Sequence, residues 1–394
     1  MFLKILLKQN SRLVDAALSF WHQGLISPDS YVIDVEQTEA NARQLLKTAS
    51  HYNIKLYLMS KQFGHNPELC RRLLACRCEG VNNKIVRYQG MVAVDFKEAR
   101  QLRRHAIPIA HIGHLVQPPS AMVDDIVSWQ PEVITVFSLE KALEISQAAC
   151  RQQVIQSLML KVCQSGDLLY AGQEAGFELN QLPTVIAAIR EMPAVRLVGI
   201  THFPCMLFDN KSQQTLPTAN MYTLLAARDI LTAQGVSVEQ INAPSATSCT
   251  TLPQLAQLGV THSEPGHAHT GTIPANQFGN QPEQISMLYL SEISHHFCYN
   301  SYFFGGGYYH RGHLQNALIW HDNHFSQSTV LPVDDNSIDY CLCLAGKFPI
   351  GSPVIMSFRT QIFVTRSDVV LIDGIQSGNP RLLGRYDNQG NMLS

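Results

Sequence analysis

The sequence predicts an α/β protein in which a (β/α)8 barrel of the TIM type precedes a smaller all-β domain. Before residue 275, short apolar runs alternate about eight times with longer segments of amphipathic helical spacing. After it, the pattern becomes a period-two alternation rich in Tyr, Phe, Val and Ile and broken by turn residues. We therefore expect an N-terminal helical extension over 1–28, the barrel over 29–275 and the β domain over 276–394.

Length and charge limit the classes of function. The chain has 394 residues, 45% of them hydrophobic, which is enough for two domains. Its formal net charge of -2 does not indicate a broad basic surface for nucleic acid or an anionic membrane. Polar residues interrupt the apolar opening segment 1–21, so we interpret it as an amphipathic helix, not a signal peptide. We expect neither nucleic acid nor membrane as a partner.

The cysteines indicate a reducing compartment. The ten of them are scattered along the chain, and neither Cys76 and Cys78 nor Cys341 and Cys343 have the spacing of a zinc finger. In a chain of this size they are typical of reduced, mostly buried thiols. We therefore expect a cytoplasmic protein.

The barrel prediction depends on the order of the strand-like runs. They are YVIDV, KLYLMS, MVAVD, IPIAHIG, VITVFS, SLMLKVC, VRLVGITHF and INAPSA. In a parallel barrel the carboxyl end of every strand faces the active site. An open doubly wound sheet is the alternative, but no glycine-rich dinucleotide loop follows the first run. We therefore favour the barrel.

Lys61 stands at the end of the second apolar run, in LYLMSKQFGHNPEL. A lysine is costly to bury, so at this position it is either ion-paired, exposed or chemically active. A partly desolvated amine has a lowered pKa and can attack a carbonyl group. Gly64 allows close backbone approach to a ligand, and His65 follows the lysine by four residues.

Further polar residues follow other strand ends. His202 ends the predicted seventh strand, Ser245 lies in the segment APSATS after the next strand, and Glu264 lies in HSEPGHAHTG. The hydroxyl and backbone N–H groups of APSATS suit a phosphate. Each residue alone has a structural explanation, such as a core histidine or a helix N-cap. Together, each at a strand end, they indicate an active site.

These motifs resemble the alanine-racemase-like group of pyridoxal-phosphate enzymes, in which a barrel precedes a β domain. VIDVEQTEAN resembles the opening strand and helix of that group, and MSKQFGHN its lysine motif. THFP, NAPSATS and SEPGHAHTG resemble the segments around the cofactor ring and phosphate. The resemblance covers residues 31–275 well and the β domain less securely.

The resemblance implies a role for each site residue. Lys61 would bind pyridoxal 5'-phosphate as a Schiff base, and His202 would stack on the pyridine ring. Ser245 and the turn at Gly266 and His267 would bind the phosphate. His65 stands where relatives often have a tyrosine near the phosphate.

Two positions depart from the alanine racemases. They have an arginine where this chain has Glu264, and another in the stretch where it has Gln173 or Glu174. A carboxylate beside the pyridine nitrogen favours its protonated form, because a negative charge stabilises a nearby cation. A protonated ring is the stronger electron sink, so Glu264 indicates α-carbanion chemistry in general.

Racemisation needs proton carriers on both faces of a planar carbanion. Lys61 can serve one face. Tyr302, Tyr308 and Tyr309 are candidates for the other, and Tyr302 best matches the tyrosine base of the group. Aromatic residues of a β domain are otherwise core packing. In relatives this tyrosine crosses a dimer interface, so the resemblance implies a homodimer.

A metal is an open alternative at this stage, although we assign no metal ligand. Imidazole and thiolate groups are zinc ligands, but no pair has a compelling spacing. The pairs are His267 and His269, His295 and His296, His310 and His313, and Cys341 and Cys343.

The sequence thus predicts a pyridoxal-phosphate enzyme acting on a small amino acid, with racemisation or epimerisation as the first choice. A lyase, aldolase or decarboxylase is the alternative that Glu264 makes credible. A protein that binds the cofactor without turnover, or a purely structural barrel, represents a different class.

Overall fold

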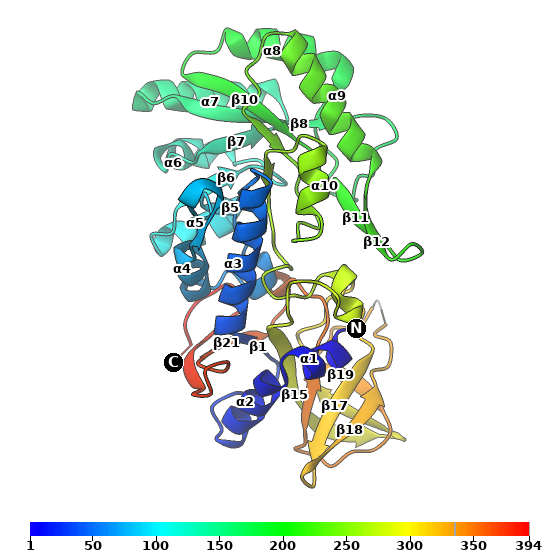
Figure 1. Ribbon diagram of the computed structural model, residues 1–394. Helices are drawn as coiled ribbons and strands as arrows, with labels where there is room; N and C mark the ends of the chain where they lie inside the picture. Colours follow the sequence, from blue (N-terminus) through cyan, green and yellow to red (C-terminus); the bar gives the residue numbers. More distant parts are fainter. Residues whose placement is uncertain (335, 394) are drawn as a thin grey trace. The chain divides into compact units, whose positions relative to one another are not determined.

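The computed structural model describes residues 1–334 and 336–393. The chain divides into two compact units, each assembled from segments that are distant in the sequence (Figure 1). The first comprises Met1–Gln44, Ser60–Leu73 and Gly266–Ser394, and the second comprises Leu45–Met59 and Leu74–Pro265. Within the described ranges, no helix has both the length and the apolar character needed to cross a bilayer.

The second unit is built on a parallel sheet with the strand order β2-β14-β13-β10-β8-β7-β6-β5. Leu58, just after β2, bridges Met91 of β5 in parallel, so the two ends of the sheet meet. This closure gives the predicted barrel of eight parallel strands. The strands are β2 (Lys55–Leu56), β5 (Met91–Ala93), β6 (Ile109–Ile112), β7 (Val133–Val136), β8 (Gln156–Cys163), β10 (Val195–Thr201), β13 (Gln240–Asn242) and β14 (His262–Ser263), with β9 (Phe177–Glu178) pairing with β8.

Helices connect these strands. Side chains cap the N-termini of several of them; Asp95 accepts from the first-turn N–H groups of α5, and Ser138 accepts from Lys141 N of α7. The helices are α3 (Val35–His51), α4 (Pro67–Ala75), α5 (Phe96–Arg104), α6 (Val123–Ser128), α7 (Leu139–Gln152), α8 (Leu182–Arg190), α9 (Ala219–Ala233) and α10 (Leu252–Gln257). Two small hairpins, β3 (Cys78–Glu79) with β4 (Ile85–Val86) and β11 (Met206–Asp209) with β12 (Gln214–Pro217), complete the set of strands in this unit.

The first unit contains a mainly antiparallel sheet with the order β18-β17-β20-β15-β1-β21-β22, to which β16 and β19 add. The all-β domain predicted after residue 275 supplies every strand of this sheet except β1. Its strands are β1 (Ser30–Asp34), β15 (Met287–Phe297), β16 (Asn300–Phe304), β17 (Asn316–His321), β18 (His324–Thr329), β19 (Cys341–Ala345), β20 (Pro353–Met356), β21 (Asp368–Asp373) and β22 (Arg381–Tyr386).

The position of β1 corrects the expectation that YVIDV is the first barrel strand. β1 pairs antiparallel with β15 and parallel with β21, so it is a central strand of the other sheet (Figure 1). All five of its residues are buried. A fully buried apolar run is compatible with the centre of either sheet, so the pattern alone could not assign it.

The eighth barrel strand is instead β14, the pair His262–Ser263 directly before Glu264. His262 pairs with Asn242 of β13, and both residues of β14 pair with β2 on the other side. A two-residue strand of polar side chains has no detectable periodicity. The count of eight was therefore right, while the membership differed by one strand at each end.

The N-terminal segment forms α1 (Leu3–Gln9) and α2 (Ser11–His22). Their apolar side chains, including Phe2, Leu6 and Leu13, belong to one hydrophobic cluster with Val32 of β1 and Val370 of β21. Burial of this apolar surface attaches the two helices to the β sheet of the first unit.

Candidate active site

Lys61 opens the short 3-10 helix η1 (Lys61–Phe63) of the first unit. The lysine is 9% exposed, so most of its side chain is removed from water. Gly64 ends the turn with φ +67°, and a Cβ there would lie 3.0 Å from Val369 and 3.1 Å from Ile362. The left-handed conformation and the close approach both favour glycine. The backbone that follows the lysine is therefore tightly held.

His65 is buried just beyond this turn. Its Nδ1 lies 2.9 Å from Ser60 Oγ, and its ring centroid lies 5.3 Å from that of Phe363. The hydroxyl and the aromatic ring fix the orientation of the imidazole.

Gly266 and His267 also belong to the first unit. A Cβ at Gly266 would lie 2.5 Å from the side-chain amide of Gln62, so the turn depends on the absence of a side chain. Nε2 of His267 is buried and has no hydrogen-bond partner among the described residues. This nitrogen is available to a ligand.

Positive charge gathers around His267. Burial lowers the pKa of His267 well below its ordinary value, and the charges of Arg359 and Lys61 lower it further. The imidazole is therefore neutral near pH 7, beside two cationic side chains. Such a group stabilises an anion, which suits the predicted contact of this turn with a phosphate.

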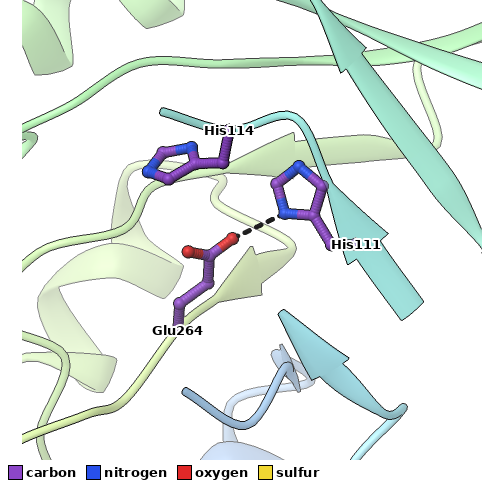
Figure 2. A group of neighbouring side chains, drawn as sticks. All are labelled: His111, His114 and Glu264. Carbon is purple, nitrogen blue, oxygen red and sulfur yellow. Dashed lines mark hydrogen bonds and ion pairs between the residues drawn. The ribbon is translucent and has the colours of Figure 1, made fainter. Parts of the chain in front are cut away.

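Glu264 follows β14 in the second unit, and its side chain is fully buried. Oε1 accepts a hydrogen bond of 2.8 Å from Asn242 Nδ2 and lies 2.8 Å from His111 Nδ1. Oε2 is buried and has no hydrogen-bond partner among the described residues. Figure 2 shows the carboxylate pointing toward His111 and His114. One oxygen is thus held and the other is available.

The surroundings of Glu264 keep it ionised. Burial by itself raises the pKa of this carboxyl group. The charges of His114 and His111, with the hydrogen bonds from His111 and Asn242, outweigh burial and lower the pKa to about 2. A buried, ionised oxygen without a partner favours a positively charged N–H donor.

His202 directly follows β10 and is fully buried. Its Nδ1 accepts a hydrogen bond of 2.8 Å from the backbone N–H of Phe203, so the ring proton is on Nε2, 2.7 Å from Asp167 Oδ2. Burial lowers the pKa of His202, although Asp167 opposes this shift. The result is a neutral imidazole of fixed orientation, which suits the predicted stacking on an aromatic ring.

Ser245 has φ +100° and the next residue, Ala246, has φ +49°. Both angles are strained for residues with side chains, and such strain is concentrated at functional sites. Ser245 Oγ donates a hydrogen bond of 2.6 Å to the carbonyl oxygen of Met206. The hydroxyl therefore holds the turn, and the backbone N–H groups are the more suitable phosphate donors.

Tyr302 lies on β16 of the first unit. Its ring stacks on His295 with centroids 5.0 Å apart, and its hydroxyl is hydrogen-bonded to Cys343, which raises the pKa of Tyr302. Its role as the second proton carrier stays a prediction.

The predicted residues are divided between the units. Lys61, His65, Gly266, His267 and Tyr302 belong to the first, and His202, Ser245 and Glu264 to the second. Within the first unit, Lys61 and His267 are close enough for their charges to interact.

Sequence reasoning missed the partners of these residues. His111 lies inside β6, His114 follows it, and Asn242 ends β13. Asp167 orients His202 from the loop after β8, and Arg359 follows β20. A detectable signal was present at His111 and Asn242, because polar residues inside the apolar runs IPIAHIG and INAPSA are unusual in a buried strand.

His111, His114 and Glu264 also have possible metal-ligand atoms that all lie within 4.8 Å of one another. However, Nδ1 of His111 faces Glu264 and Nε2 lies 2.6 Å from Thr135 Oγ1, so both ring nitrogens are engaged. We therefore assign no metal to this group. The histidine and cysteine pairs considered from the sequence are not part of it.

Comparison with known proteins agrees with this architecture. Residues 33–274 match the family "Alanine racemase, N-terminal domain", and residues 288–382 match "YhfX-like, C-terminal domain". The chain is 55% identical over 395 residues, covering 100% of both chains, to "Uncharacterized protein YhfX" of Escherichia coli (strain K12).

Solved structures share the fold at low sequence identity. D-threonine aldolase from Filomicrobium marinum has a TM-score of 0.64 at 12% identity, covering 93% of this chain and 95% of that one. Alanine racemase of Clostridium difficile 630 has 0.61 at 15%, covering 91% and 98%. D-threo-3-hydroxyaspartate dehydratase from Delftia sp. HT23 has 0.63 at 14%, covering 91% and 97%. The chain belongs to the alanine racemase N-terminal domain family and has a YhfX-like C-terminal domain.

Proposed function

We propose that this chain is a pyridoxal-phosphate enzyme that moves a proton at the α-carbon of a small amino acid, as a racemase or epimerase. The observation that carries the proposal is the buried, ionised Glu264 with one unpartnered oxygen. A charge of this kind is costly unless it binds a cation or a strong donor.

The chemistry of several described residues supports the proposed cofactor. Glu264 Oε2 matches a protonated ring nitrogen, and His267 Nε2, close to the positive charges of Lys61 and Arg359, matches a phosphate. The strained backbone at Ser245 adds a second candidate phosphate segment. His65 is the remaining candidate near the phosphate.

When bound, pyridoxal phosphate withdraws electrons from the α-carbon of the substrate. Lys61 would hold it covalently, Glu264 would keep a proton on the ring nitrogen, and the neutral imidazole of His202 would lie against the ring. Once the substrate amine had replaced Lys61 on the cofactor, the released Lys61 amine would move a proton at the α-carbon from one face, and Tyr302 would move one from the other.

A lyase, including an aldolase or decarboxylase, is the second candidate. Glu264 favours it as much as it favours racemisation, because a protonated ring supports cleavage of any bond at the α-carbon. Proteins of the same fold include an aldolase and a dehydratase as well as a racemase. A cofactor-binding protein without turnover is the third, although it would need no second proton carrier.

We also propose a homodimer, because the family tyrosine that Tyr302 resembles acts across such an interface. We also propose a cytoplasmic location, because ten scattered cysteines in a chain of this size are typical of reduced thiols.

The cofactor assignment is tested by reducing the purified, cofactor-saturated protein with borohydride and mapping its peptides. We expect a visible absorption band that disappears on reduction and a pyridoxyl group on Lys61. Lys61→Ala should abolish the band, whereas replacement of the exposed Lys84 should not. A saturated protein without a modified Lys61 would refute the proposal.

The reaction is tested with single enantiomers of small amino acids in deuterated water. Loss of chirality with deuterium at the α-carbon supports a racemase, and fragments or ammonia without inversion support a lyase. Absence of both, with a loaded Lys61, identifies a binding protein.

A further inference from the structure

A line of hydrogen bonds runs from β7 through β6 to the segment after β14. Thr135 Oγ1 lies 2.6 Å from Nε2 of His111, and Nδ1 of the same imidazole lies 2.8 Å from Glu264 Oε1. All three residues are at most 3% exposed, so water does not compete for these contacts.

The position of one proton in this line is determined. An ionised carboxylate only accepts hydrogen bonds, so Nδ1 of His111 carries a hydrogen and donates to Oε1. This holds for the neutral and for the charged imidazole. If the imidazole is neutral, the Thr135 hydroxyl donates to Nε2.

The arrangement selects one oxygen of Glu264. His111 of β6 and Asn242 of β13 both bind Oε1, while Oε2 has no partner among the described residues. Two donors on one oxygen fix the rotation of the carboxylate group. The direction in which Oε2 points is therefore fixed as well.

We propose that His111, held by Thr135, is a positioning residue for Glu264, directing Oε2 at the ring nitrogen of the bound cofactor. This inference rests on the proposed function. It assigns to His111 and Thr135 a role that acts through Glu264.

Other titratable groups near Glu264 are part of the same setting. His114 follows β6, and its ring centroid lies 5.7 Å from that of His111. Glu264 also influences Tyr57, His262 and Cys205, each of which is buried. None of these three donates to Glu264; the hydrogen bonds that orient it come from His111 and Asn242.

The direct test is the 15N NMR resonance of pyridoxal phosphate labelled at the ring nitrogen and bound to the full-length protein. Its chemical shift reports the proton and the hydrogen bond at that atom, independently of turnover. Wild type is compared with Glu264→Gln, His111→Leu and His111→Asn. The Asn side chain places an amide donor near the position of Nδ1, so it is the conservative variant.

We expect Glu264→Gln and His111→Leu to move the resonance in the same direction, and His111→Asn to restore most of the wild-type value. Cofactor affinity should fall about tenfold in His111→Leu, as expected for one lost hydrogen bond to a charged group. Thr135→Val should produce a smaller displacement, and Thr135→Ser none. If His111→Leu does not fold, the two Thr135 variants and His111→Asn provide the same comparison.

Several outcomes overturn the inference. A resonance that moves in Glu264→Gln but not in His111→Leu removes the role of His111. A resonance unmoved by Glu264→Gln removes that of Glu264, while a pyridoxyl group on Lys61 leaves the proposed function standing. Stoichiometric zinc that is lost in His111→Leu makes the cluster a metal site instead. An unmodified Lys61 in wild type refutes the proposed function itself.

Discussion

Glu264 keeps its charge inside the barrel because two imidazoles and an amide surround it. A carboxyl group whose pKa is lower in the folded than in the unfolded state contributes stability above its unfolded pKa. This contribution is lost as the pH falls through the folded pKa.

For Glu264 that window runs from its ordinary value of 4.5 down to about 2. We expect the difference in unfolding free energy between wild type and Glu264→Gln to shrink as the pH is lowered from 6 toward 3. Urea unfolding over this range measures it. A difference independent of pH would contradict the assigned ionisation.

Gly64 tests the backbone next to Lys61. An alanine there has φ +67° and a Cβ only 3.0 Å from Val369, whereas Gly24 has φ +71° and nothing within 4 Å. We expect Gly64→Ala to lower the unfolding free energy by about 2 kcal/mol and Gly24→Ala by about 1 kcal/mol. Denaturant unfolding measures both free energies. Equal losses in the two variants would show that the contact of the added Cβ with Val369 costs no stability.

For single residues, the sequence indicated the candidate site residues at strand ends. It did not indicate the residues that hydrogen-bond to them and orient them. Lys61 and Glu264 were detectable because a charged residue directly beside a buried strand is unusual. His111 was not singled out, because a histidine inside an apolar run does not reveal which residue it contacts. Its partner Glu264 lies far away in the sequence, and only the closed barrel brings them together.

Gly199 of β10 allows the backbones of the neighbouring strands β10 and β13 to lie close together. It pairs with Gln240, and its Cβ would lie 2.1 Å from the Gln240 carbonyl oxygen, a backbone atom that cannot move aside. β10 also shifts register against β8 at this point. An alanine must therefore separate the two strands.

We expect Gly199→Ala to lower the unfolding free energy by about 3 kcal/mol. It should also displace Asn242, at the end of β13, from Glu264. Gly172→Ala is the control, since nothing lies within 4 Å of its Cβ. Thermal unfolding of both variants measures the effect, and a loss in Gly199→Ala no larger than the control would contradict it.

The elements themselves were largely predictable. Long buried runs such as SLMLKVC and VRLVGITHF became β8 and β10, because apolar β-branched segments between amphipathic helices fit a parallel sheet. β1 was assigned to the wrong sheet, and the polar β14 was missed. Both errors have one cause: pairing partners are chosen by tertiary contacts that local periodicity does not contain.

Across the first unit, Asn10 joins three distant segments of the chain. Its Nδ2 donates to Asp34 Oδ2 at 2.9 Å and to the Ile285 carbonyl at 3.1 Å, and its Oδ1 accepts from Gln376 at 2.9 Å. Asn10 is 3% exposed, so these bonds are shielded from water.

We expect Asn10→Ala to lower the unfolding free energy by about 2 to 3 kcal/mol, because it leaves buried partners unsatisfied. Arg12→Ala is the control, since its bond to the Gln376 carbonyl is exposed. Chemical unfolding of the two variants decides the matter, and equal effects would contradict the assigned role of Asn10.

The placement of β1 between β15 and β21 has a consequence for exchange of parts among relatives. A chimaera joined at residue 275 would combine the C-terminal strands of one parent with the central strand of the other. The two halves of such a hybrid would have to match side chain for side chain along Ser30–Asp34. In functional recombinants within this family, the N-terminal segment and the C-terminal strands should therefore come from the same parent.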